Sequence, residues 1–402
     1  MTTSAIFTIN AGSSSLKFSL WHLAGPDDLQ ELLRGKIEKI GIAPRVTAST
    51  PRGDTLLDKT FGSGGAALTH EALLQNLFAQ RVWSRSNAGL VAVGHRVVHG
   101  GPAFVEPVVI DDAVMDRLSQ LEPLAPLHQP HNLSAIRACA SLAPGVPQVA
   151  CFDTAFHHTM APVARRLGLP RVYTDAGIRR YGFHGLSYEF IARRLGTIDP
   201  VVAGGRLIVA HLGNGASLCA MQDGKSIDTT MGFTALDGLL MGTRPGTLDP
   251  GAVTYLMRQR AMTASEVEDM LYHCSGLLGV SGISSDMRTL LASNDPRARE
   301  AVDLFVFRAA REIGAMAASL GGVDCLVFTA GIGEHAPAIR ARICERCSWL
   351  GVILDEEANR VGRQCISAQT SRVAAYVIPT DEERMIAAHA SSAVMPGGHP
   401  VS

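Results

Sequence analysis

The stretch TINAGSSSLKFSL, residues 8–20, places one Gly and three consecutive Ser between two apolar segments. Its second half alternates apolar and polar side chains, and a period of two predicts a strand. The apolar segment before the Gly predicts another strand, so the whole stretch predicts a β-hairpin. Gly and Ser favour turns for conformational reasons alone. A loop of small hydroxylic residues is also suited to hold phosphate, and the rest of the sequence has to decide between the two.

The stretch LIVAHLGNGASLCAM, residues 207–221, repeats this arrangement about 200 residues later. An apolar strand runs into Asn-Gly-Ala-Ser and is followed by a second apolar strand. Two copies of one strand–loop–strand motif, half a chain apart, predict two duplicated domains, each with a loop suited to bind phosphate.

The length of the chain also favours two domains, because its 402 residues exceed the ~250 to 300 at which a single core stops growing. Residues 296–320 carry an apolar stripe with helical spacing and end at a Gly pair, which predicts a long helix. An apolar strand (325–330), a Gly-rich loop (331–337) and a helix from about residue 338 follow. Strand, loop and helix in series predict an α/β fold.

Charge and cysteine usage narrow the class of protein. The net charge is -1 and Lys and Arg are not clustered, so we expect neither nucleic acid nor a membrane as a partner. No apolar run has the ~18 to 20 residues of a membrane span, and no basic segment precedes the first apolar stretch, so we expect a cytoplasmic protein. The CxxC formed by Cys344 and Cys347 lacks a second pair, so we expect it to pack in a helix rather than bind zinc.

Two nucleotide-binding motifs can be tested on spacing. DGKS, residues 223–226, ends like a P-loop, but Cys219 stands where that motif needs a Gly. GIGEHA, residues 331–336, follows a strand and fits the dinucleotide-binding pattern, with Asp355 at the position of a ribose-binding acid. Taken alone, it favours a nicotinamide oxidoreductase. Against this, only about 70 residues follow the motif's first Gly, too few for repeated βαβ units.

Polar residues in Gly-rich surroundings favour phosphoryl transfer instead. Arg96 in GHRVVHGG and Arg244 in MGTRPGTLDPG lie in Gly-flanked segments, and a guanidinium group matches carboxylate and phosphoryl oxygens. Asp153 and His184 follow apolar or aromatic residues and precede small ones, which predicts polar groups at strand ends.

Two further pairs have the chemistry of metal ligands. Glu382 and Glu383 after YVIPT are typical of the first turn of a helix, and equally of a carboxylate that holds Mg²⁺. His128 and His131 in PLHQPHN have metal-like spacing but no evident third ligand, so we expect structural histidines.

Across the whole chain the sequence resembles the acetokinase family, the acetate and butyrate kinases within the superfamily of sugar kinases, heat-shock chaperones and actin. The segments that carry the resemblance occur in family order and are TINAGSSSLK, GHRVVHGG, PLAPLHQP, FDTAFHHTM, YGFHGLSYEF, HLGNGASL, DTTMGFTALDGLLMGTRPGTLDP, SGISSDMR, TAGIGEHA and PTDEE.

The resemblance implies an α/β fold of two duplicated ribonuclease H-like, actin-like ATPase domains around a central cleft. We expect an N-terminal domain of residues 1–153 with 385–402, and a nucleotide-binding domain of residues 154–384. It also implies a homodimer and reversible in-line transfer between ATP and acetate, giving acetyl phosphate and ADP. Mg²⁺ is the expected ion, with Mn²⁺ as the alternative. Propionate is the alternative substrate.

The same resemblance implies roles for individual residues. It assigns metal binding to Asn10 and Glu382, the substrate carboxylate to Arg96, proton transfer to Asp153, and transition-state stabilisation to His184 and Arg244. The apolar acyl pocket is assigned to Val98, Leu127, Phe183 and Ala235. ATP contacts are assigned to Ser13, Ser15, Lys17, His211, Leu212, Gly213, Asn214, Gly215, Asp286, Met287, Arg288, Gly331, Ile332, Gly333, Glu334 and His335.

The chemistry of the substrate qualifies one of these roles. A simple carboxylate has a pKa of about 4 to 5 and is already a nucleophile near neutral pH, so it needs little help from a base. We therefore expect Asp153 to position another group. The harder task is stabilising charge on the γ-phosphoryl oxygens, which requires Arg, a His donor, backbone N–H groups and a metal ion.

Two positions depart from the family pattern. Ala235 stands where the family usually has Pro, near the acyl methyl pocket, and His335 stands where Asn is common, at the ATP end. A smaller wall at Ala235 favours propionate, though one methylene changes discrimination by only ~1 to 3 kcal/mol. A non-catalytic ATP-dependent clamp on the same fold is a further alternative, against which the retained arginines and His184 argue.

Overall fold

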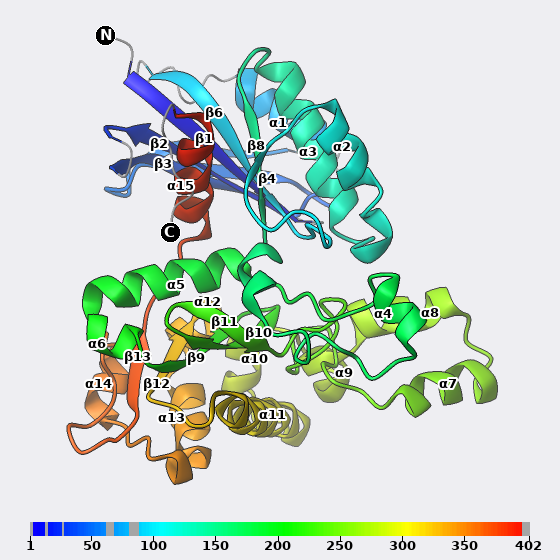
Figure 1. Ribbon diagram of the computed structural model, residues 1–402, viewed down its shortest axis with the longest axis vertical. Coiled ribbons are helices and arrows are strands. Elements are labelled where there is room, and N and C mark those ends of the chain that lie inside the picture. Colours follow the sequence, from blue (N-terminus) through cyan, green and yellow to red (C-terminus); the bar gives the residue numbers. More distant parts are fainter. Residues whose placement is uncertain (1–2, 13–14, 26–27, 62–67, 80–87, 396–402) are drawn as a thin grey trace. The chain divides into compact units, whose positions relative to one another are not determined.

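The computed structural model describes residues 3–12, 15–25, 28–61, 68–79 and 88–395 (Figure 1). The chain packs as two compact units, one of Met1–Ala155 with Asp381–Ser402 and one of Phe156–Thr380. Because the chain returns to the first unit after Thr380, Glu382 packs with the first unit, whereas the expected second domain extended to residue 384.

The described residues of the first unit form an eight-stranded sheet in the order β5-β4-β3-β2-β1-β6-β8-β7. Its strands are β1 (Thr3–Ala11), β2 (Leu16–Leu23), β3 (Leu29–Glu38), β4 (Arg45–Ser49), β5 (Thr55–Thr60), β6 (Ala88–Val97), β7 (Val108–Val109) and β8 (Gln148–Phe152). Its helices are α1 (His70–Ala79), α2 (Asp112–Ser119), η3 (Glu122–Leu124), α3 (Gln129–Leu142) and α15 (Glu382–Val394), and η4 (Ala155–Thr159) leads into the second unit.

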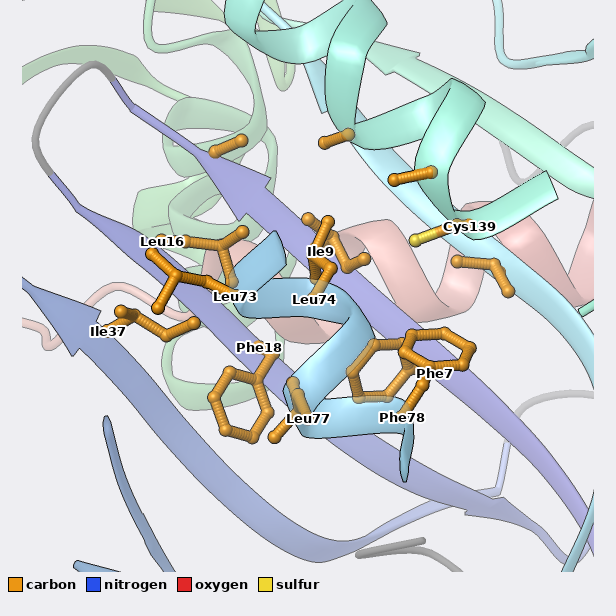
Figure 2. Packing of buried hydrophobic residues seen from close by; sticks show 14 of the residues in the cluster. Phe7, Ile9, Leu16, Phe18, Ile37, Leu73, Leu74, Leu77, Phe78 and Cys139 are labelled. Carbon is orange, nitrogen blue, oxygen red and sulfur yellow. The ribbon is translucent and has the colours of Figure 1, made fainter. Parts of the chain in front are cut away.

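One face of this sheet packs against α1 and α3. Side chains alternate along a strand, so Phe7 and Ile9 of β1 point to the same face, where they are buried with Leu73 and Leu74 of α1 (Figure 2). Phe7 also meets Phe78 edge-on, with 5.6 Å between ring centroids. A slip of one residue would turn this apolar set to the other face, so the layer fixes the register of β1.

The opposite face packs against α15. Asn10 follows Ile9 in β1 and therefore points to this face, where it contacts Glu382 of α15. Gly94 in β6 leaves room for the helix, because a Cβ atom there would lie 2.6 Å from Ile386 Cγ2. The alternation of side chains along β1 thus places apolar residues on the face that packs against α1 and the polar Asn10 on the face toward α15.

The second unit has a five-stranded sheet among its described residues, in the order β11-β10-β9-β12-β13. Its strands are β9 (Arg206–Leu212), β10 (Ala216–Gln222), β11 (Lys225–Thr229), β12 (Cys325–Thr329) and β13 (Ala374–Val377). Its helices are α4 (Arg171–Asp175), α5 (Gly185–Ile198), α6 (Pro200–Ala203), α7 (Pro250–Gln259), α8 (Ala264–Asp269), η5 (Met270–Cys274), α9 (Gly276–Ser281), α10 (Met287–Ala292), α11 (Pro296–Leu320), α12 (Ala330–His335), α13 (Pro337–Arg346), η6 (Ser348–Leu350) and α14 (Glu356–Val361).

Helices cover this second sheet as well. Leu207 and Val209 of β9 are buried with Tyr188 and Ile191 of α5. The long helix α11 packs against β10 on the other side of the sheet (Figure 1). The unit therefore has a layer of helix on each face of a largely buried sheet.

The two sheets repeat one topology. Each contains three consecutive antiparallel strands followed by two parallel strands, in the orders β3-β2-β1-β6-β8 and β11-β10-β9-β12-β13. In the first sheet, β4 and β5 extend this set beyond β3, and β7 extends it beyond β8. The first hairpin pairs Asn10 with Lys17 and the second pairs His211 with Ser217. The α/β fold, both hairpins and the duplication were predicted from the sequence and are confirmed.

Other sequence expectations can be checked locally. The long helix was predicted over residues 296–320 and is found as Pro296–Leu320, capped by the Asp295 side chain. Cys344 lies in α13 and Cys347 ends it, both buried, as expected of a packed CxxC. Among the described residues, none of the helices combines the length and apolar character needed to cross a membrane.

Candidate active site

Three polar side chains meet at the ends of neighbouring strands in the first unit. Arg96 lies near the end of β6, Asp153 follows β8, and Asn10 is the penultimate residue of β1. These strands are parallel neighbours, so their carboxyl ends share one edge of the sheet. Arg96 donates from Nε to Asp153 Oδ1 (3.0 Å) and from Nη2 to Asp153 Oδ2 (2.5 Å). Its Nη1 donates to Asn10 Oδ1 at 3.0 Å.

This ion pair is largely shielded from solvent, because the side chain of Asp153 is 1% exposed and that of Arg96 is 17% exposed. Burial by itself lowers the pKa of Arg96, but Asp153, with Glu382 and Glu383, holds it above its ordinary value. A guanidinium group has five N–H donors, of which described residues engage three. Two N–H groups of a firmly oriented cation are therefore left for oxygens of a ligand.

Helix α15 brings two carboxylates to the same edge, since Glu382 and Glu383 occupy its first turn. Asn10 donates from Nδ2 to Glu382 Oε2 at 3.1 Å. Oε1 of Glu383 is buried without a hydrogen-bond partner among the described residues. Burial raises the pKa of the Glu383 carboxyl, an effect that Lys17 opposes. Oxygen donors and negative charge are thus concentrated beside Asn10.

The first hairpin loop is closed by its own backbone, because Gly12 donates its N–H to the carbonyl of Ser15 at 2.8 Å. His70 Nε2 donates to the Gly12 carbonyl at 2.7 Å and so ties the loop to the start of α1. Ser15 and Lys17 are exposed, as residues that contact a ligand must be before it binds. Ser13, also predicted to contact phosphate, lies outside the described residues.

Two amides that sequence reasoning missed hold this edge together. Asn132 donates from Nδ2 to the carbonyl of Ala11 at 2.7 Å and accepts at Oδ1 from the N–H of Val98 at 3.0 Å. It therefore ties the end of β1 to the end of β6. Gln129 accepts from the N–H of His99 at 3.3 Å. The segment PLHQPHN contains both amides, and its concentration of polar residues was the available signal.

His184 does not lie at a strand end, and that prediction was wrong. It precedes α5 and has φ 59° and ψ 24°, a left-handed conformation that is uncommon for a residue with a Cβ atom. Gly182 also has a positive φ, 78°, so the segment turns tightly. The apolar residues before His184 are buried in this turn rather than in a strand.

His184 stacks on His211, with 4.1 Å between ring centroids and 16° between ring planes. Each ring is hydrogen-bonded through Nδ1 to a serine, His184 to Ser217 and His211 to Ser187, both at 2.8 Å. The Ser187 hydroxyl also lies 2.8 Å from Thr380 Oγ1. The pair is therefore held by neutral hydroxyl groups.

Arg244 lies beside the second hairpin loop. Its Nη1 donates to the carbonyl of Ala235 at 3.0 Å, and its guanidinium carbon lies 5.9 Å from the centre of the Tyr272 ring. A Cβ atom at Gly215 would lie 3.4 Å from His184 Nε2 and 3.9 Å from Arg244 Nη1. Because Gly215 has no side chain, both nitrogens come close to the backbone of the loop.

The segment GIGEH was predicted to be a loop, but it forms the helix α12 directly after β12, so that prediction was wrong. Glu334 Oε1 accepts from the N–H of Thr380 at 3.2 Å and lies 3.5 Å from Thr329 Oγ1. Arg340, which is 1% exposed, donates from Nη1 to the carbonyls of Gly333 and Glu334, both at 2.9 Å. A buried guanidinium thus fixes the end of α12, and the sequence had given no reason to single out Arg340.

The segment DMR, also predicted to contact ATP, begins α10. Asp286 caps this helix by accepting from the N–H groups of Arg288 at 2.8 Å and Thr289 at 3.1 Å. The Arg288 guanidinium, followed by these N–H groups, lowers the pKa of Asp286 to about 2. The side chain of Arg288 is 89% exposed, whereas Met287 is buried. The segment has a clear capping role, and its contact with ATP stays a prediction.

Comparison with known proteins places the chain in one family. Residues 5–388 match the model of the Acetokinase family. The chain belongs to the acetokinase family. Acetate kinase of Rhodopseudomonas palustris is 54% identical over 388 residues, which cover 96% of this chain and 97% of that protein. Acetate kinase of Rhizobium meliloti is 51% identical over 387 residues, again covering 96% and 97%.

Solved structures of this kind share the fold. The chain superposes on Porphyromonas gingivalis acetate kinase with a TM-score of 0.85 at 36% identity, covering 98% of this chain and 100% of that one. A propionate kinase from Francisella tularensis gives a TM-score of 0.88 at 36% identity, covering 96% and 98%. The repeated α/β architecture is therefore the actin-like ATPase fold found in acetate kinases.

The residues that the acetokinase resemblance singled out divide between the two units. The first unit contains Asn10, Ser15, Lys17, Arg96, Val98, Leu127, Asp153 and Glu382. The second contains Phe183, His184, His211, Leu212, Gly213, Asn214, Gly215, Ala235, Arg244, Asp286, Met287, Arg288, Gly331, Ile332, Gly333, Glu334 and His335. Contacts within the first unit join Asn10, Arg96, Asp153 and Glu382. Within the second unit, His184 and Arg244 converge on the 213–215 loop.

Proposed function

We propose that the chain is an ATP:acetate phosphotransferase, an acetate kinase that forms acetyl phosphate and ADP reversibly by direct in-line transfer. The observation that carries this proposal is 54% identity to an acetate kinase over nearly the whole of both chains. The Arg96–Asp153 pair and the His184–Arg244 pair supply groups that a reaction between two anions needs.

Arg96 is the proposed binder of the acetate carboxylate. Its two remaining N–H groups suit a carboxylate, and its orientation is fixed before substrate arrives. Acetate is already a nucleophile at neutral pH, so no group has to remove a proton from it. Asp153 accepts hydrogen bonds from Nε and Nη2 along one edge of the guanidinium. It therefore acts by holding the Arg96 side chain in its orientation.

Asn10 and Glu382 are the proposed protein ligands of Mg²⁺, or of Mn²⁺ in its place. An amide oxygen and one carboxylate are the hard donors such ions take, with water and substrate phosphates completing the shell. The buried, unpartnered Glu383 Oε1 fits a nearby cation, whose charge would offset that of the carboxylates. When bound, Mg²⁺ neutralises charge on the phosphate oxygens of ATP.

His184 and Arg244 are the proposed stabilisers of the transferring phosphoryl group. His184 Nε2 and Arg244 Nη1 lie next to Gly215, which leaves the loop without a side chain at that point. The 211–215, 286–288 and 331–335 segments are proposed to bind ATP, with Ser15 and Lys17 on its phosphates. Preorganised donors of this kind lower the barrier because they need no reorientation as charge develops.

Hydroxylamine trapping tests the activity. Purified protein is incubated with ATP, Mg²⁺ and acetate, propionate or butyrate, and the acyl hydroxamate is measured. We expect product with acetate. Folded protein that gives no hydroxamate from any of the three acids would remove the proposal.

Propionate is the second proposed substrate. Ala235 replaces the Pro that is usual near the acyl pocket, and a propionate kinase is among the similar structures. The ratio of kcat/KM for acetate over propionate measures the preference directly.

Location and assembly are proposed on the same basis. A cytoplasmic homodimer without nucleic acid or membrane partners agrees with the family resemblance and the near-neutral charge. Light scattering on the purified protein tests the dimer, because a monomer at working concentration would contradict it.

A further inference from the structure

We propose that Tyr188 and Ser217 form a hydroxyl relay that fixes His184 as the tautomer with its proton on Nε2. This nitrogen then donates a hydrogen bond beside the 213–215 loop. The inference concerns how His184 is positioned, and its catalytic consequence rests on the proposed phosphoryl transfer.

The relay starts at Tyr188, whose side chain in α5 is fully buried. Its hydroxyl lies 2.5 Å from Ser217 Oγ and contacts no other hydrogen-bonding group among the described residues. Burial holds the pKa of Tyr188 well above its ordinary value, so the phenol keeps its proton. A buried O–H group has to donate its hydrogen bond, and Ser217 is the acceptor within reach.

Ser217 in β10 links the hydroxyl of Tyr188 to the imidazole ring of His184, and its own hydrogen bonds follow from that of Tyr188. Its side chain is fully buried and is bonded, within the described part of the chain, to Tyr188 and to His184 Nδ1 at 2.8 Å. A hydroxyl that accepts from Tyr188 has one proton of its own, which it donates to Nδ1. A neutral imidazole whose Nδ1 accepts a hydrogen bond carries its proton on Nε2.

The backbone directs Nε2 to the loop. His184 adopts a left-handed conformation, which a residue with a Cβ atom keeps only when its surroundings enforce it. Stacking on His211 and a hydrogen bond from His157 Nε2 to the Phe183 carbonyl, 3.0 Å long, supply that support. The Nε2 atom lies 3.4 Å from the position that a Cβ atom of Gly215 would occupy. The N–H group is therefore presented to the backbone side of the loop.

The neighbouring ring shows what is special about this arrangement. His211 Nδ1 is bonded to Ser187, which is bonded in turn to Thr380, with distances like those of the first relay. Thr380 is only partly buried, so its hydroxyl can also donate to water. At His184 the direction of the hydrogen bonds is fixed, because Tyr188 is a fully buried donor with one acceptor. At His211 the direction of the hydrogen bonds is not fixed.

Nitrogen-15 NMR of protein labelled at histidine tests the tautomer directly. The unliganded wild-type protein is used, and the His184 signals are assigned by their loss in His184→Gln. We expect a protonated Nε2 and an unprotonated Nδ1 for His184. A proton on Nδ1 would overturn the relay, and this outcome needs no variant of the relay itself.

Two substitutions test the consequence for the reaction. Ser217→Ala removes the group that donates to Nδ1, so both tautomers should be populated and kcat should fall about 10- to 100-fold. Tyr188→Phe removes the donor that sets the direction of the Ser217 hydroxyl, so the Nδ1–H tautomer should become populated beside the Nε2–H tautomer and kcat should fall about 3- to 10-fold. Tyr376→Phe is the matched control, because Tyr376 is in the same core and its hydroxyl donates to Asp199 outside the relay. It should leave kcat unchanged.

These outcomes separate the relay from the proposed function. Ser217→Ala that keeps a single Nε2–H tautomer and wild-type kcat would overturn the relay. A general loss of packing would lower kcat in Tyr376→Phe as well, which would also count against a specific relay. Wild-type protein with the expected tautomer but no acyl phosphate would support the relay and reject the proposed function.

Discussion

The two sheets place different chemistry at equivalent positions. Strand pairing aligns the first hairpin with the second and carries the alignment to the neighbouring parallel strands. Counting onward from these pairings, Asn10, Lys17, Arg96 and Asp153 of the first unit correspond to His211, Ser217, Thr329 and Thr380 of the second. One topology thus carries a cluster of charged side chains in one copy and a cluster of hydroxyl and histidine side chains in the other.

The difference teaches that the fold supplies positions and the side chains supply the chemistry. In the first unit, an arginine and several carboxylates suit the binding of an anion and a metal ion. In the second, Arg244 and a histidine bonded to a serine hydroxyl face a loop of small residues.

The largest loss of activity in the second unit is expected from substitutions of Arg244. Arg244→Ala should lower kcat by about 10³-fold or more, as the loss of a transition-state arginine does. Arg244→Lys should not restore activity, because a point charge cannot replace the guanidinium fork. Steady-state kinetics with acetate and ATP measure both. Near-normal kcat in either variant would show that the second unit does not depend on this group.

The first unit is tested at its buried ion pair. Asp153→Asn leaves the Arg96 charge without its partner, so the free energy of unfolding should fall by about 3 to 5 kcal/mol and the KM for acetate should rise. Arg45 and Asp58 form a pair with similar geometry on the surface of the same unit. Asp58→Asn should leave stability nearly unchanged. Equal losses in urea unfolding of the two variants would show that burial is not what distinguishes the pairs.

Each unit also contains a histidine that burial keeps neutral. Burial lowers the pKa of His95 in the first unit and of His157 in the second to about 4. The unfolded chain binds more protons between pH 4 and about 6.5, so this stability is present above pH 6.5 and lost as the pH falls to 4. The loss should be on the order of 3 kcal/mol for each histidine. About 2 kcal/mol of this should already be lost at pH 5, which is about 1.5 units below the unfolded pKa. Urea unfolding at pH 7.5 and 5 measures that difference, and a pH slope left unchanged by His95→Gln would contradict the contribution of the first unit.

The smallest effect concerns the proposed acyl pocket. Ala235 carries the carbonyl that orients Arg244 and stands where Pro is usual in the family. Ala235→Pro should raise the preference for acetate over propionate by up to about tenfold, because one methylene group is at stake. The kcat/KM ratio for the two acids measures the preference. A ratio shifted toward propionate would show that the residue does not limit the pocket.

Local sequence patterns predicted much of this molecule because their causes are local. Alternation predicted the first hairpin, and apolar strands around a similar loop predicted the second. The Gly pair ended α11, and Glu382 and Glu383 occupy the first turn of α15 as expected. The repeated motif also predicted the duplication. The residues assigned to the site came from the family resemblance rather than from any single pattern.

What the sequence could not provide depends on contacts between distant residues. Asn132 ties β1 to β6, and Arg340 fixes the end of α12, through hydrogen bonds that only the folded chain brings together. His184 was expected at a strand end, because nothing in its neighbours reveals a left-handed backbone. The relay from Tyr188 likewise depends on packing α5 against β10.

Phosphorus NMR of one reaction mixture tests the central claim most directly, since it follows every phosphate species at once. Purified protein, Mg²⁺, ATP and acetate are observed together over time. We predict that an acyl phosphate signal rises as the γ-phosphate signal of ATP falls, mole for mole. Inorganic phosphate rising in its place would indicate an ATP-hydrolysing clamp, and either that result or unchanged ATP with folded protein would contradict transfer to acetate.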